Sequence, residues 1–184
     1  PALNNSETHK YIGAVSFHSW RGCDDVTLKK WADAAKAINV PLLVGEGSTD
    51  AAAHGYAEIF NESTFALYEI NLYTRICAIC QPLSILQWQL TSDYSLLWGD
   101  GIYGSKGPLR PTQRFWNIKQ LASTPADALA IPVRSGKKNV NCAAFGNMVR
   151  GEYAVHMVNN GAECEAVISG IPAEVKELKV YVLS

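Results

Sequence analysis

Apolar residues recur with two different periods along the first 125 residues of the chain. Short apolar runs such as "YIGAVSF" and "VPLLVG" are typical of buried strands. Each run is followed by a segment in which apolar residues return every three to four positions, as they do on one face of a helix. The pattern predicts strands at residues 11–17, 41–44 and 84–90, and helices at residues 24–38, 48–80 and 110–122.

This alternation of strands and helices favours a parallel sheet covered by helices. The patterning changes near Pro125, after which apolar and polar residues alternate in short segments separated by Gly, Asn and Pro. Such segments predict antiparallel strands, at residues 139–147, 152–161, 164–171 and 175–184. We therefore expect an α/β chain, with three βα units in residues 1–125 and a small antiparallel β portion in residues 126–184.

The composition is that of an ordinary globular protein. The 184 residues are 48% hydrophobic and 18% charged, and the formal net charge is -1. This balance gives no electrostatic reason to expect nucleic acid or an anionic membrane as a partner. No stretch approaches the roughly 20 apolar residues of a membrane span, and no GxGxxG or GxxxxGK[ST] run marks a nucleotide site. A flavodoxin-like or Rossmann nucleotide binder is therefore disfavoured.

The five cysteines do not show the Cys/His spacing of a zinc site. Cys77 and Cys80 fall within a helical pattern, where cysteine commonly acts as a small buried hydrophobic residue. Cys142 and Cys164 lie on two predicted strands and could pair as a disulfide. We expect neither a metal nor another cofactor.

Ionisable and aromatic residues follow each of the three predicted parallel strands. They are His18, Trp20 and Arg21 after the first strand, Glu46 after the second, and Trp88 and Tyr94 after the third. In parallel βα architectures the chemistry gathers at the carboxyl ends of the strands. A carboxylate among aromatic rings suits a carbohydrate, because the rings stack on the apolar face of a sugar. The glycines on both sides of Glu46 would let a sugar ring approach the backbone.

Each of these residues also has a purely structural interpretation. Glu46 could be a solvated turn residue that favours the N-terminus of the following helix through its dipole. Trp20 and Trp88 could be core residues, because tryptophan is usually mostly buried. His18 could be a structural histidine. The occurrence of all four at equivalent ends of successive strands favours the functional interpretation.

Three segments together resemble the last third of a clan-A glycoside hydrolase barrel. They are "LLVGEGSTD", "SILQWQLTSDYS" and "GPLRPTQRFWNIKQLASTP". The resemblance is to the glucosylceramidase and endo-glucanase/xylanase type, which carries a side β-sandwich. It implies strands six to eight of a (β/α)8 TIM barrel, followed by closing strands of the sandwich. It also implies that Glu46 is the nucleophile at the end of strand seven, with His18 beside it and Trp88 under the reacting sugar.

The same resemblance implies a retaining β-glycosidase that acts on oligo- or polysaccharides outside the cell or in the periplasm. Such an enzyme needs a second carboxyl about 5–5.5 Å from the nucleophile. In this clan that acid/base lies at the end of strand four, usually after an asparagine, and no Asn-Glu strand end precedes Glu46. We therefore expect an N-terminal barrel half, as a separate chain or cleaved fragment, or self-association to supply it. The chain alone would be inactive.

Two other interpretations stay open. The chain could be a non-catalytic carbohydrate-binding or scaffold protein derived from the same fold. It could also be an inverting hydrolase that uses Asp93 or Asp50 as its second carboxyl, although nothing in the sequence fixes the spacing of about 6.5–9.5 Å that inversion needs.

Overall fold

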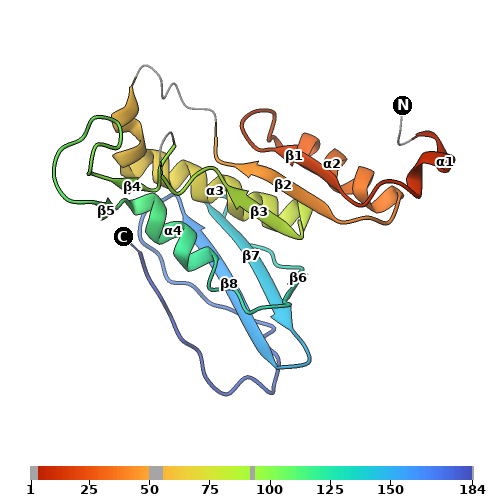
Figure 1. Ribbon diagram of the computed structural model, residues 1–184. Helices are drawn as coiled ribbons and strands as arrows, with labels where there is room; N and C mark the ends of the chain where they lie inside the picture. The colour runs from red at the N-terminus through yellow and green to blue at the C-terminus, as the bar shows by residue number, and fades with distance from the viewer. Residues whose placement is uncertain (1–3, 50–55, 92–93, 184) are drawn as a thin grey trace.

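The computed structural model describes residues 4–49, 56–91 and 94–183. Its first sheet contains β1 (Val15–His18), β2 (Leu42–Gly47) and β3 (Ser84–Gln87) in the order β1-β2-β3, and both neighbouring pairs are parallel (Figure 1). The prediction of three adjacent parallel strands is confirmed. β1 begins later than the sequence predicts, because Tyr11 is 81% exposed and lies outside the core.

Helices α2 (Asp25–Ala37) and α3 (Ser63–Cys80) connect these strands, and α4 (Gln113–Leu121) comes after β3. The side chain of Asp24 accepts a hydrogen bond from the backbone N–H of Thr27 and so caps the N-terminus of α2. Among the helices in the described part of the chain, none has the combination of length and apolar composition that a bilayer crossing requires.

The prediction of a single helix over residues 48–80 is wrong. The described part of this segment holds a 3-10 helix, η2 (Ala57–Asn61), and then α3. Glu62 between them has an extended backbone, with φ -82° and ψ 136°, which interrupts the helical path. A short helix that the sequence pattern did not indicate, α1 (Ser6–His9), precedes β1.

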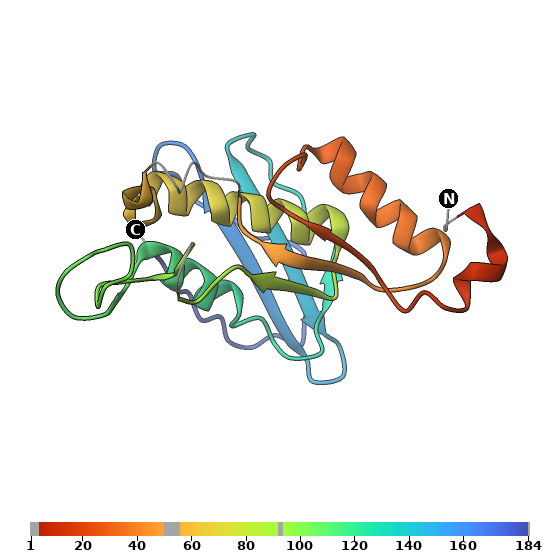
Figure 2. The ribbon, with the colours of Figure 1, turned by 45° about the horizontal axis from the view of Figure 1, so that its top comes forward.

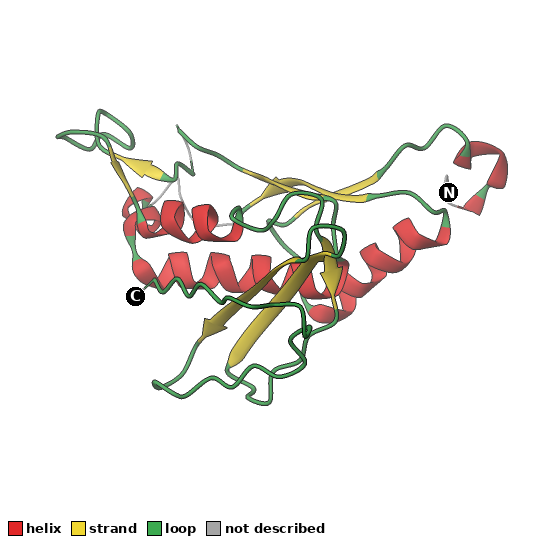
Figure 3. Ribbon diagram, turned by 90° about the horizontal axis from the view of Figure 1, so that it is seen from below, coloured by secondary structure: helices red, strands yellow, loops and turns green. Residues whose placement is uncertain are grey.

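The core lies between one face of the parallel sheet and helices α2 and α3 (Figures 2 and 3). Leu28 from α2, Val44 from β2 and Ile76 from α3 are fully buried there. The opposite face carries His18, which is exposed, and Leu86, which is 56% exposed. Within the described ranges, helices therefore cover one face of the parallel sheet.

A second sheet contains β6 (Leu129–Ile131), β7 (Val140–Asn147) and β8 (Glu152–Asn159), all antiparallel in the order β6-β7-β8. The antiparallel strands predicted at residues 139–147 and 152–161 are confirmed as β7 and β8, whereas β6 was not predicted. The Asn141 amide on β7 donates a 2.7 Å hydrogen bond to the Asn71 side chain on α3. Helix α3 therefore contacts this sheet as well as the parallel one (Figure 3).

The loop between β3 and α4 contains a two-stranded ribbon that the sequence pattern did not indicate. It pairs β4 (Leu97–Trp98) with β5 (Arg110–Pro111). The ribbon follows the segment that carries Tyr94 and precedes α4 in the chain. Its second strand, β5, contacts α4.

The last two predicted strands are wrong. Residues 164–171 and 175–183 form no strand, and they expose apolar side chains such as Val167 and Val180 at 84% and 82%. A strand forms only where a neighbour supplies backbone N–H and C=O groups, and no strand in the described ranges pairs with these segments. The disulfide considered for Cys142 and Cys164 is also absent, since both thiols are free.

Candidate active site

The structure brings three of the predicted site residues together at the carboxyl ends of β1 and β2. The indole N–H of Trp20 donates a 2.9 Å hydrogen bond to Oε2 of Glu46. Nδ1 of His18 lies 3.2 Å from the same oxygen. The Glu46 side chain is 30% exposed, so it is held from one side and still open to a ligand.

A β-bulge brings His18 and Glu46 into register. Phe17 on β1 pairs with Val44 on β2, but the next residue, His18, pairs with Glu46 and skips Gly45. A bulge of this kind redirects the side chain that follows it. The extra residue Gly45 therefore presents Glu46 at the strand end beside His18.

The glycines on both sides of Glu46 serve the packing of the strand. A Cβ at Gly45 would lie 2.7 Å from Oγ of Ser16, and a Cβ at Gly47 would lie 2.7 Å from both Cγ2 of Ile85 and the hydroxyl of Tyr73. The expectation that the glycines make room for a sugar ring is wrong, because neighbouring side chains already fill that space.

Glu46 has two polar contacts in the described part of the chain, one with the indole nitrogen of Trp20 and one with Nδ1 of His18. Both contacts fall on Oε2. Within the described residues, Oε1 of Glu46 is therefore the oxygen left to act on a ligand.

Tyr94 contacts the ring of Trp20, and Trp88 follows β3 next to the end of β2. The ring of Tyr94 meets the ring of Trp20 edge-on, with centroids 4.8 Å apart. The backbone N–H of Trp88 donates a 2.8 Å hydrogen bond to the carbonyl of Gly47, which places Trp88 beside the end of β2. Its side chain is 40% exposed, so Trp88 is not a core residue, and its peptide bond to Gln89 is cis.

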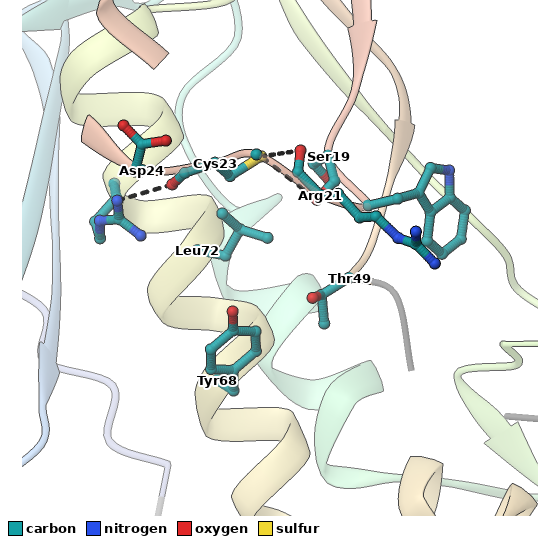
Figure 4. A pocket seen from close by; sticks show the side chains of 10 residues that line it. Ser19, Arg21, Cys23, Asp24, Thr49, Tyr68 and Leu72 are labelled. Carbon is teal, nitrogen blue, oxygen red and sulfur yellow. Dashed lines mark hydrogen bonds between the residues drawn. The ribbon is translucent and has the colours of Figure 1, made fainter. Parts of the chain in front are cut away.

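Arg21 lines a neighbouring hollow of about 480 Å³ between the β1–α2 loop and α3. Figure 4 shows Ser19, Arg21 and Thr49 on the strand side of this hollow, with Tyr68 and Leu72 reaching toward it from α3. Trp20 is the residue that this hollow shares with the Glu46 site.

Cys23 borders the same hollow but is a poor nucleophile. Burial raises the pKa of its thiol, so the protonated form dominates at neutral pH. Arg75 is engaged as well, through hydrogen bonds to the carbonyl of Cys23 and to the carboxylate of Asp25. Cys23 therefore offers little thiolate at this end of the sheet.

A buried ion pair beneath the strand ends is the part of the site that the sequence pattern missed. Nε and Nη2 of Arg114 donate hydrogen bonds of 2.9 and 2.8 Å to the two carboxylate oxygens of Glu69. The two side chains are 0% and 1% exposed. Each lies on the apolar stripe of its helix, Glu69 four residues before Tyr73 and Arg114 four residues before Ile118, and that placement was the available signal.

Glu69 connects the ends of the three parallel strands through a hydrogen-bond network. The hydroxyl of Ser48, after β2, donates a 2.9 Å bond to Glu69, and the backbone N–H of Ser48 donates to the hydroxyl of Ser19 after β1. Gln87 on β3 donates to Glu69 and accepts from the hydroxyl of Tyr73. Burial, with the charge of Glu69 adding to it, raises the pKa of Tyr73 well above its usual value, so this phenol stays a neutral donor.

Asp50 and Asp93, the carboxylates considered for an inverting reaction, lie outside the described residues. Glu62 stands at the start of α3 and accepts a hydrogen bond from the hydroxyl of Tyr56.

Comparison with known proteins gives a likeness of fold. The sequence matches no model of a known protein family and no curated protein. Among solved structures, the chain is similar to a GH30 endoxylanase from Clostridium papyrosolvens C71, with a TM-score of 0.64 and 12% sequence identity. The match covers 88% of this chain and 37% of the endoxylanase chain. The chain therefore has a glycoside hydrolase-like fold and spans little more than a third of the length of that enzyme.

Proposed function

We propose that this chain is the C-terminal part of a retaining β-glycosidase. Residues 1–125 would supply strands six to eight of a TIM barrel, and residues 126–184 would supply part of a side β-sandwich. The observation that carries the proposal is the contact of Glu46 with Trp20 and His18 at the carboxyl ends of adjacent parallel strands. In barrel enzymes this end of the sheet carries the active site.

Glu46 acts as the nucleophile in this proposal. Its free Oε1 attacks the anomeric carbon and forms a covalent glycosyl-enzyme ester, while the leaving oxygen takes a proton from the acid/base. Water then releases the sugar and restores the carboxylate. Trp20 and His18, which contact Oε2, hold the Glu46 carboxylate in one orientation. Trp88, with its partly exposed ring, is the sugar platform, and Arg21 and Tyr94 border the binding region.

The acid/base is proposed to come from a part of the assembly outside these residues. Neither polar contact of Glu46 in the described part of the chain comes from a carboxyl group. The parallel sheet also exposes Leu86 on the face opposite the helices, although parallel sheets are normally covered on both faces. A barrel half from an N-terminal segment or separate chain, or a second copy of this chain, would both cover that face and supply the carboxyl.

The proposed substrate is a β-linked oligo- or polysaccharide, which implies a secreted or periplasmic enzyme. The similar solved structure is an endoxylanase, so xylan is the first substrate to test. The test is hydrolysis of xylan by the full natural product of the gene, compared with its Glu46→Gln variant. Glu58→Gln is the matched control, because Glu58 is an exposed glutamate on η2.

We expect activity in the parent and in Glu58→Gln, with a loss of several orders of magnitude in Glu46→Gln. Full activity in Glu46→Gln would overturn the proposal. One observation favours a non-catalytic carbohydrate-binding protein as a second candidate: Trp88 presents an exposed ring while Glu46 has no carboxyl partner in the described residues. Binding of xylan without hydrolysis by the full natural product would favour that candidate.

A further inference from the structure

The Glu69–Arg114 pair is fully buried and joined by two hydrogen bonds. A buried ion pair is seldom kept for stability alone, because desolvation of the two charges offsets much of their attraction. Arg114 also has donors left over after Glu69 is satisfied. The groups that accept hydrogen bonds from these remaining donors indicate the role of the pair.

Arg114 holds the backbone of the loop after β3. Its Nη1 donates hydrogen bonds of 3.1 Å to the carbonyl of Tyr94 and 2.8 Å to the carbonyl of Ser95. Tyr94 has a φ of 61°, a left-handed conformation that an aromatic residue adopts only where the surroundings impose it. The Arg114 fork therefore fixes the strained residue that carries the Tyr94 ring.

The face of the Arg114 guanidinium also reaches Tyr94 through a second route. Cζ of Arg114 lies 4.9 Å from the ring centroid of Phe60, and the rings of Phe60 and Tyr94 are 4.8 Å apart. Tyr94 in turn meets the ring of Trp20, whose N–H binds Glu46. A continuous series of contacts thus runs from the buried pair to the candidate nucleophile.

We propose that Arg114, oriented by Glu69, is a positioning residue that sets the geometry of Glu46 through Tyr94 and Trp20. The significance of this role for turnover rests on the proposed glycosidase function, but the positioning itself does not. The Arg114 side chain is 0% exposed, and its hydrogen-bond partners in the described residues are Glu69, Tyr94 and Ser95. It acts by fixing the loop against which the Trp20 indole packs.

The experiment measures the coupling between Trp20 and Glu46 in the 184-residue chain by NMR with 15N-labelled tryptophan. Glu46→Gln should shift the indole N–H resonance of Trp20, which Trp20→Phe identifies by its loss. The same comparison is then made in a Glu69→Met/Arg114→Met background, which replaces the pair by apolar side chains and leaves no unpaired buried charge. We expect the shift to become at least threefold smaller there. An unchanged shift in the folded double variant would overturn the proposal.

Two further variants keep the proposal testable if the double variant does not fold. Arg114→Lys keeps the charge beside Glu69 but lacks the planar guanidinium that reaches both carbonyls. Tyr94→Ala removes the ring that contacts Trp20 and leaves the Glu69–Arg114 pair intact. Both should reduce the shift as the double variant does, and an unchanged shift in either folded variant would overturn the proposal. The control replaces the exposed Arg150–Glu152 pair by methionines and should leave the shift unchanged.

The outcome is separate from that of the proposed function, because no substrate is present. Coupling that depends on Arg114, in a protein that never hydrolyses a glycoside, would sustain the positioning role and refute the glycosidase.

Discussion

The indole N–H of Trp20 and the carboxylate of Glu46 join the ends of two adjacent parallel strands through a 2.9 Å hydrogen bond. The bond reaches a carboxylate that is still partly exposed, and it leaves the second oxygen available. A structural turn residue would not require a donor aimed at it from a neighbouring strand end. This relationship is therefore the best structural support for a functional Glu46.

Trp20→Phe removes the donor while keeping an aromatic ring against Tyr94. A hydrogen bond to a charged group contributes about 1.5–3 kcal/mol. Under the proposed function, we therefore expect the kcat/KM of the full natural product of the gene to fall roughly ten- to a hundredfold, with little change in the unfolding midpoint. Steady-state kinetics and urea denaturation measure the two quantities. Trp116→Phe on α4 is the control, and equal kinetics for the two variants would contradict a role for the indole N–H.

Trp88→Ala should weaken sugar binding more than it weakens the fold. Truncation of an aromatic residue at the centre of a binding site costs about 2 kcal/mol or more, which corresponds to a roughly thirtyfold rise in Kd. Because the ring is 40% exposed, the loss in folding stability should stay below the about 3–5 kcal/mol of a core Trp→Ala change. Calorimetric titration with a xylo-oligosaccharide gives the Kd.

Trp116→Ala is the matched control for that measurement, since Trp116 is also 40% exposed but lies on α4. The platform role of Trp88 is refuted if the two variants bind the oligosaccharide with the same affinity as the parent.

Glu69→Gln should destabilise the chain strongly, because it leaves the Arg114 charge buried without its partner. Removing one member of a buried pair costs about 3–5 kcal/mol, whereas replacing both by apolar residues is often nearly neutral. Urea denaturation should therefore show a larger loss for Glu69→Gln than for Glu69→Met/Arg114→Met.

Asp25→Asn gives the comparison with a more exposed pair. It breaks the Arg75–Asp25 contact, in which the Asp25 side chain is 71% exposed, and should cost less than about 1 kcal/mol. If Glu69→Gln lowers the free energy of unfolding no more than Asp25→Asn does, the buried pair does not contribute to the stability of the fold.

His156 should make stability depend on pH. Burial lowers the pKa of this histidine below its usual value of 6.5, so the folded state favours the neutral ring that contacts Thr124. The unfolded chain binds the proton more readily, so this contribution is present above pH 6.5 and is lost as the pH falls through the lowered pKa. The urea midpoint should therefore drop between pH 7.5 and pH 5 more steeply in the parent than in His156→Gln. If the urea midpoint changes equally with pH in the parent and in His156→Gln, His156 does not contribute to the pH dependence of stability.

The sequence predicted the parallel sheet, because each strand is marked by its own apolar run. It also predicted that His18, Trp20 and Glu46 lie close together, because the carboxyl ends of parallel strands lie at the same edge of a sheet. It missed Glu69 and Arg114, because charged residues on helices are normally solvated and only their position on the apolar stripe indicated burial. It was wrong about strands at residues 164–171 and 175–184, because alternation shows that a segment can pair without showing that a partner strand is present.

A carboxylate nucleophile at Glu46 would form a covalent bond to the sugar. The most direct measurement is labelling of the full natural product of the gene by a 2-fluoro xylo-oligosaccharide with an activated leaving group, followed by peptide mass analysis. We expect one covalent adduct, on the peptide that contains Glu46, formed in Glu58→Gln and absent in Glu46→Gln. An adduct on a different carboxylate, or turnover of the reagent that leaves Glu46 unmodified, would contradict this role of Glu46.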